Sequence, residues 1–121
     1  MEHTILVAVV DDDESVRESL PDLLRELGYA SQVFASAEEF LVSSHLPDGL
    51  LLDIVLPGMS GPELQRELIR RGYRIPVIFI SALGDKSVPP NLLQDGAIDC
   101  LFKPFSEETL RSALAAALPR S

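Results

Sequence analysis

The chain is poor in cysteine, in basic residues and in long apolar runs. Its one cysteine, Cys100, excludes an internal disulfide and favours a reducing compartment, so we expect a cytoplasmic protein. Ten basic residues against 19 acidic ones give a formal charge of −9, and the scattered basic residues form no face for nucleic-acid phosphates. No apolar run approaches the roughly 18 residues of a membrane span, and the first residues lack the positive charge of a secretory signal. These absences predict a soluble, intracellular chain that binds neither nucleic acid nor membranes directly.

Short apolar runs alternate with amphipathic stretches along the chain. The apolar runs cover residues 5–10, 29–34, 50–53, 75–80 and 97–102. Helices are expected after four residues that can serve as N-caps, namely Asp13, Ser36, Ser60 and Ser106. The second run is the most polar and should lie near a sheet edge. This alternation predicts an α/β fold with a doubly wound parallel sheet, and the length predicts one domain over residues 1–121.

Polar side chains stand where three of the apolar runs end. The first run ends in Asp11, Asp12 and Asp13. The third ends in Asp53 and the fifth in Lys103. Because ligands of open α/β sheets bind beyond the carboxyl ends of the strands, these side chains should meet at one edge. Carboxylates gathered with one ammonium can hold a hard divalent cation and a phosphoryl group, so the pattern indicates phosphoryl chemistry.

Each of these residues also has a purely structural explanation. The aspartates after the first run could cap the first helix, and Asp53 could belong to the turn before Pro57 and Gly58. Lys103 could be a solvated loop residue ahead of a proline. An aspartate directly behind three leucines is poorly explained as a turn former, however, which favours a functional role for Asp53.

Four segments together resemble the receiver domain of two-component response regulators. They are residues 10–13, 52–61, 80–82 and 103–105, and the similarity extends from residue 4 to about residue 118. The resemblance implies a flavodoxin-like, CheY-like (βα)5 fold with five parallel strands in the order 2-1-3-4-5. It also implies that the protein is no enzyme in the ordinary sense, because it would catalyse only its own phosphorylation and dephosphorylation.

The resemblance assigns the chemistry to three side chains. Asp53 would accept the phosphoryl group as an acyl phosphate. Lys103 and the Ser81 hydroxyl would contact oxygens of the transferred group, because catalysis here rests mainly on positioning and charge neutralisation. The peptide bond between Lys103 and Pro104 would be cis.

A magnesium ion is implied beside the acceptor. Asp12, Asp53 and the backbone carbonyl of Val55 would bind Mg²⁺ directly, and Asp11 would hold a metal-bound water. Mn²⁺ could substitute for Mg²⁺. The extra acid, Asp13, would cap the first helix.

The resemblance also implies the partners. A sensor histidine kinase or a phosphotransfer protein would supply the phosphoryl group, and phosphorylation would switch an output surface. Relatives typically dimerise on phosphorylation, so a homodimer is one expected assembly. Both a fragment of a transcription regulator and a stand-alone module fit the sequence.

Two features depart from the family pattern. Cys100 stands three residues before Lys103, where relatives usually carry an aromatic residue. Pro89 and Pro90 leave room for hardly two turns, so the fourth helix should be short or irregular. Both features favour an alternative, a phosphorylation-independent interaction module, whereas the complete acceptor set favours the switch. An aspartyl phosphatase would need a carboxylate two residues after the nucleophile, where Val55 stands.

Overall fold

The computed structural model describes residues 4–82 and 99–118. Strands and helices alternate along these ranges. They are β1 (Leu6–Val10), α1 (Glu14–Glu26), β2 (Ala30–Phe34), α2 (Ala37–Leu41), β3 (Gly49–Asp53), α3 (Gly61–Arg70), β4 (Val77–Ala82), β5 (Asp99–Lys103) and α4 (Glu107–Ala117). The predicted short helix around Pro89 and Pro90 lies outside the described residues, so α4 is the helix that follows β5. No helix within the described ranges is long and apolar enough to cross a membrane.

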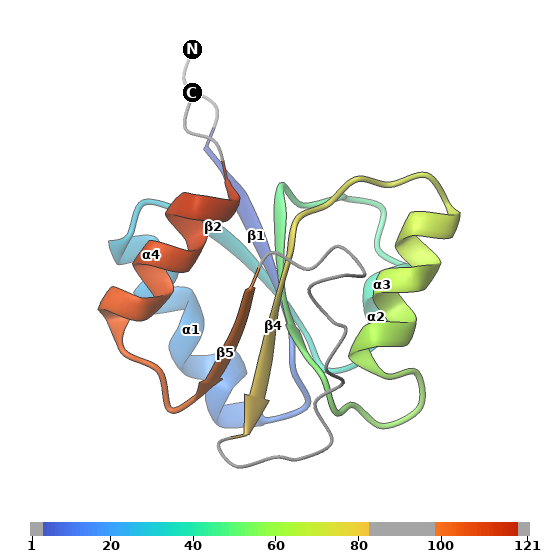
Figure 1. Ribbon diagram of the computed structural model, residues 1–121, viewed down its shortest axis with the longest axis horizontal. Helices are drawn as coiled ribbons and strands as arrows, with labels where there is room; N and C mark the ends of the chain where they lie inside the picture. The colour runs from blue at the N-terminus through green and yellow to red at the C-terminus, as the bar shows by residue number, and fades with distance from the viewer. Residues whose placement is uncertain (1–3, 83–98, 119–121) are drawn as a thin grey trace.

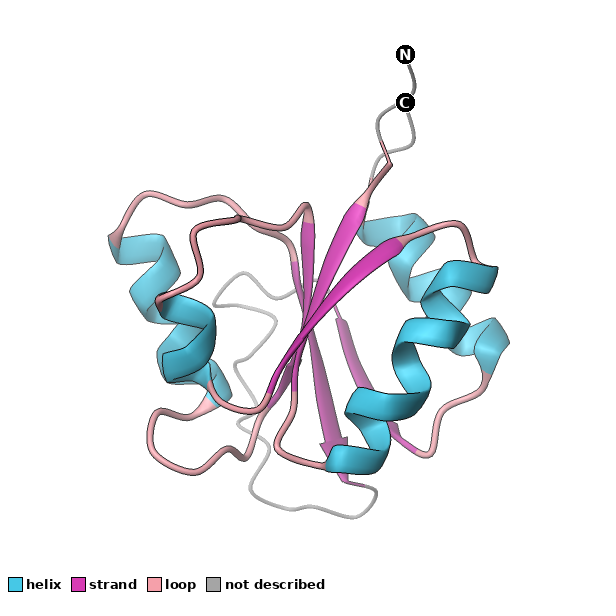
Figure 2. Cartoon of the chain, turned by 180° about the vertical axis from the view of Figure 1, so that it is seen from behind, coloured by secondary structure: helices cyan, strands magenta, loops and turns pink. Residues whose placement is uncertain are grey.

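The five strands form one parallel sheet in the order β2-β1-β3-β4-β5, as predicted. Figure 1 shows α1 and α4 on one face of this sheet and α2 and α3 on the other. Figure 2 shows the same three layers from behind. β2 lies at an edge, in agreement with its polar sequence. The strand order turns back at β1, which places the crevice between β1 and β3 at the switch point where such sheets bind ligands.

Successive residues of the central strands contribute to two separate cores. In β1, Val7 and Val9 pack with α1 and α4, whereas Ala8 and Val10 pack with α2 and α3. All five residues of β3 are buried. A strand covered on both faces reads as a continuous apolar run, which explains why the sequence showed runs rather than alternation.

The helices begin at the predicted caps. The side chains of Asp13, Ser36, Ser60 and Ser106 each accept a hydrogen bond from a backbone N–H of the first helical turn. At α3 the cap is reciprocal, because Glu63 also accepts from the Ser60 amide. Since α1, α3 and α4 begin shortly after strands end, these caps fix the loops at the carboxyl edge of the sheet.

Candidate functional site

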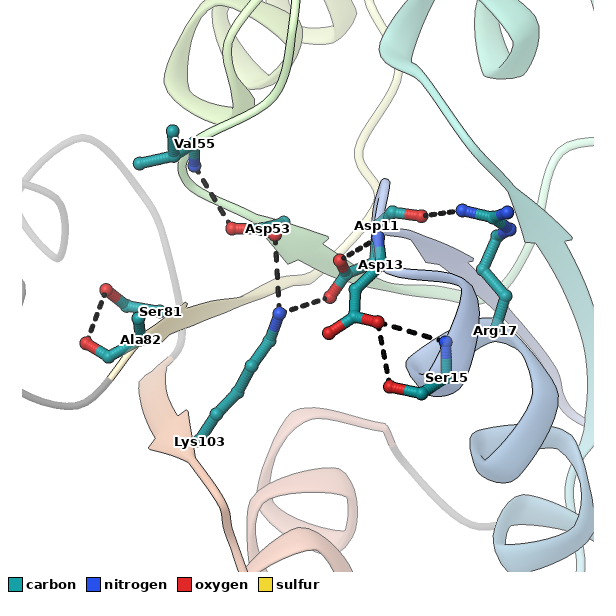
Figure 3. Close-up of polar contacts among 9 residues, drawn as sticks. All are labelled: Asp11, Asp13, Ser15, Arg17, Asp53, Val55, Ser81, Ala82 and Lys103. Atoms are coloured by element: carbon teal, nitrogen blue, oxygen red, sulfur yellow. Dashed lines mark hydrogen bonds and ion pairs between the residues drawn. The ribbon is translucent and has the colours of Figure 1, made fainter.

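The carboxyl edge of the sheet brings together side chains from four strands. Asp11 follows β1, Asp53 ends β3, Ser81 lies near the end of β4 and Lys103 ends β5. Figure 3 shows the Lys103 side chain reaching toward the space between the two aspartates. Parallel strands deliver their last residues to the same edge, so the predicted convergence of Asp11, Asp53 and Lys103 is found.

The Lys103 ammonium joins two carboxylates. Its Nζ lies 2.9 Å from Asp11 Oδ2 and 3.4 Å from Asp53 Oδ2. Asp11 is fully buried and Asp53 is 7% exposed, whereas the lysine side chain is 24% exposed. Apart from its ion pair with Lys103, Asp11 Oδ2 has no partner among the described residues. The nearby cation therefore offsets the cost of burying this carboxylate.

Two hydrogen bonds hold Asp11, one to its side chain and one to its backbone carbonyl. Its Oδ1 accepts a hydrogen bond from the Asp13 amide at 2.9 Å, and its carbonyl oxygen accepts from Arg17 Nη1 at 3.0 Å. Asp13 itself accepts from the Ser15 amide as the N-cap of α1, which confirms the role predicted for it. The acidic triplet is thus divided, because Asp13 belongs to the helix cap and Asp11 to the site.

The environment of Asp53 disfavours its ionised form. Its Oδ1 accepts from the Val55 amide at 3.1 Å. Burial, and next repulsion from Asp11, raise the pKa of Asp53 to about 6, although Lys103 and the Val55 amide oppose the rise. Burial lowers the pKa of Lys103, but the carboxylates of Asp11 and Asp53 outweigh burial, so its pKa is raised overall. A cation in this place is therefore part of the folded site.

Three carboxylates are close enough to share a metal ion. Asp11, Asp12 and Asp53 each offer one oxygen, and these atoms lie within 4.8 Å of one another. Hard oxygen donors of this kind fit Mg²⁺. The donor set is thus compatible with divalent metal binding, while the role of the Val55 carbonyl stays a prediction.

The β4 and β5 ends differ in how they contribute. The Ser81 hydroxyl is buried and donates to the Ala82 carbonyl oxygen at 3.4 Å, a weak contact directed away from Asp53. Its predicted contact with a transferred group therefore stays a prediction. Cys100 pairs in register with Phe79 and packs against the core under α2 and α3. The bond between Lys103 and Pro104 is cis, as predicted.

Sequence reasoning missed the part that Gly61 plays. A Cβ at this position would collide with the Asp53 carbonyl oxygen and lie 3.1 Å from Ile54 Cα. The Gly61 amide donates to the Ile54 carbonyl oxygen at 3.0 Å. The signal in the sequence was a glycine directly after the Ser60 cap, at the start of a helix. In the structure Gly61 has no left-handed backbone conformation, so the close approach to Asp53 is what requires a glycine there.

Comparison with known proteins agrees with this geometry. Residues 7–115 match the sequence model of the response regulator receiver domain. The chain belongs to this family. The receiver domain is 43% identical to nodulation protein W of Bradyrhizobium diazoefficiens over 118 residues, which are 95% of this chain and 52% of that protein. It is 41% identical to the response regulator protein TodT of Pseudomonas putida, over 93% of this chain and 51% of that protein.

The fold of the receiver domain is shared with solved structures. The crystal structure of FixJ-N superposes with a TM-score of 0.85 at 35% identity, covering 95% of this chain and 94% of that one. The predicted family and fold are therefore confirmed. The chain spans about half the length of the curated relatives cited above.

Proposed function

We propose that this receiver domain is a phosphorylation-controlled switch in which Asp53 accepts a phosphoryl group from a histidine kinase or a phosphotransfer protein. One observation carries the proposal, namely the Lys103 ammonium that lies between Asp11 and Asp53 at 2.9 and 3.4 Å. A cation at the acceptor can neutralise the oxygens of an arriving phosphoryl group. Packing alone gives no reason for two carboxylates and an ammonium to be buried together.

The residues of the chain would act mainly by position. An oxygen of Asp53 would form a bond to phosphorus while the phosphorus–nitrogen bond of the donor's phosphohistidine breaks, leaving an acyl phosphate on Asp53. Lys103 would hold one phosphoryl oxygen and the Ser81 hydroxyl another. Such a loose transition state needs little covalent help from the protein. The domain would catalyse only this step and the later hydrolysis, so it is not proposed to act on a separate substrate.

The acidic cluster would hold Mg²⁺, with Mn²⁺ as a substitute. Asp12, Asp53 and the Val55 carbonyl would be the direct ligands, and Asp11 would orient a bound water. The ion would supply further neutralisation of phosphoryl charge when bound. Support comes from the three carboxylate oxygens that lie within 4.8 Å of one another.

The setting of this reaction is also part of the proposal. We expect it to take place in the cytoplasm, with phosphorylation changing an output surface and a homodimer as one candidate response. Because the chain covers about half of its curated relatives, the output of the whole protein is proposed only as regulation through this switch.

Intact-mass spectrometry after incubation with Mg²⁺ and acetyl phosphate tests the proposal. The wild type should gain one phosphoryl group, whereas Asp53→Asn and a metal-free sample should gain none. Asp22→Asn, an exposed position on α1, should be labelled like the wild type and controls for the loss of a surface charge. Folded wild type that gains no mass would contradict the switch and favour the phosphorylation-independent module.

A further inference from the structure

The loop that carries Val55 is held by a helix from elsewhere in the chain. Residues 55–60 form most of the connection between β3 and α3. Glu38, in the first turn of α2, accepts a hydrogen bond from the Met59 amide at 2.9 Å through Oε2, across 21 residues of sequence. The other hydrogen bonds described for residues 55–60 come from Asp53 and α3. Glu38 is thus the external polar contact of this loop among the described residues.

The loop is shaped to receive the Glu38 carboxylate. Gly58 has a φ of +73°, a left-handed conformation that favours glycine. A Cβ at Gly58 would lie 2.7 Å from Glu38 Oε2, so the carboxylate sits directly against this turn. The end of the loop is fixed by the reciprocal cap between Ser60 and Glu63. Glu38 and this cap therefore constrain adjacent residues, Met59 and Ser60.

The position of the loop matters for the metal because Val55 lies at its beginning. The Val55 amide already contacts Asp53 Oδ1 at 3.1 Å, so the loop and the acceptor are aligned by the same residue. A loop that is ordered before binding loses less conformational freedom when a ligand arrives. Contacts behind the ligands commonly tune metal affinity in this way.

We propose that Glu38 is a positioning residue that orders residues 55–60 for Mg²⁺ binding through its hydrogen bond to Met59. This inference rests on the proposed function, because it takes the Val55 carbonyl as a ligand. The hydrogen bond, rather than the negative charge of Glu38, carries the effect.

Two substitutions separate the hydrogen bond from the charge. Glu38→Ala removes both, whereas Glu38→Gln removes the charge and keeps an oxygen acceptor. Glu39→Ala is the matched control, because Glu39 is the neighbouring acid on α2 and its side chain, among the described residues, accepts a hydrogen bond only from the Ala35 amide at 3.5 Å. Calorimetric titration of unphosphorylated protein with Mg²⁺ gives the affinity of each variant.

Glu38→Ala should weaken Mg²⁺ binding by about fivefold, below the loss typical of groups that touch a ligand directly. Glu38→Gln and Glu39→Ala should bind within about twofold of the wild type. Hydrogen exchange of the Met59 amide in metal-free protein should accelerate in Glu38→Ala and not in Glu38→Gln.

Three outcomes would overturn the inference. Glu38→Ala that binds Mg²⁺ like the wild type would show that the contact does not order the site. A loss in Glu38→Gln as large as in Glu38→Ala would assign the effect to charge. Wild-type protein that binds no Mg²⁺ would refute the proposed metal site and the inference with it. The failure of the metal site is therefore distinguishable from a failure of the role of Glu38 alone.

Discussion

The site has a buried part and an exposed part. The buried carboxylates have a cationic partner within the folded chain, and the exposed carboxylate has none among the described residues. Asp11 and Asp53 are buried and share the Lys103 ammonium, which is present without any ligand. Asp12, the chain neighbour of Asp11, is exposed, and within residues 4–82 and 99–118 the structure gives its side chain no hydrogen bond or ion pair. We therefore expect changes at the buried carboxylates to alter the stability of the metal-free domain, and a change at the exposed carboxylate to alter metal binding with little effect on stability.

Removing the cation should have the largest effect on stability. Lys103→Met keeps the apolar stem but leaves two buried carboxylates without their partner, which should lower the free energy of unfolding by about 3 kcal/mol. Urea unfolding in the presence of a chelator measures this loss. Arg111→Met removes an exposed residue that pairs with Glu107 and Glu108, and it should change stability by less than about 1 kcal/mol. Equal losses in the two variants would contradict a compensating role for Lys103.

Neutralising Asp53 should have an intermediate effect on stability, with the opposite sign. Because the pKa of Asp53 is raised to about 6 by burial and next by Asp11, folded protein keeps this proton at pH values where unfolded protein has lost it. The stability of the wild type therefore falls relative to Asp53→Asn as the pH rises from about 4 to about 6. Metal-free Asp53→Asn should be more stable than the wild type by on the order of 1–2 kcal/mol at neutral pH. This gain should vanish below about pH 4, where both states of the wild type are protonated.

The same pH series has an internal control. Hydrogen bonds from the Ser15 side chain and amide lower the pKa of Asp13, which is exposed. Wild type should therefore gain stability relative to Asp13→Asn as the pH rises through the acidic range, the reverse of the behaviour at Asp53. Thermal unfolding in a chelator at several pH values checks both directions. If the stability difference from the wild type changed with pH in the same way for both variants, the raised pKa of Asp53 would be refuted.

Changing the exposed carboxylate should have the smallest effect on stability. Asp12→Asn removes no described contact within the domain, so its free energy of unfolding should stay within about 0.5 kcal/mol of the wild type. Its Mg²⁺ affinity should nevertheless fall by about tenfold, because a proposed metal ligand loses its charge. Urea unfolding and calorimetry on the same samples give both numbers. A large stability loss in Asp12→Asn, or an unchanged Mg²⁺ affinity, would contradict the distinction between the buried and the exposed part of the site.

The fold could be predicted because the parallel strands are covered on both faces. Each of the five apolar runs begins and ends within two residues of a strand that the structure describes. The predicted β4 began too early at residue 75, since Pro76 has no amide to donate and the strand begins at Val77. The site residues could be named because topology alone places strand ends together, whatever the orientation of each side chain.

The remaining features depend on distances that no pattern in the sequence encodes. Lys103 lies closer to Asp11 than to the acceptor, and the Ser81 hydroxyl turns toward Ala82. The contact between Glu38 and Met59 joins the first turn of α2 to the loop before α3, and the packing of both helices on the same face of the sheet brings these residues together.

Gly61 shows how a site can limit variation at a position that carries no chemistry. Its Cα faces the backbone of Asp53 so closely that even a methyl group would displace the Asp53 carbonyl. Any side chain at position 61 would therefore require the backbone of Asp53 to move. Keeping Asp53 in place thus requires that position 61 has no side chain.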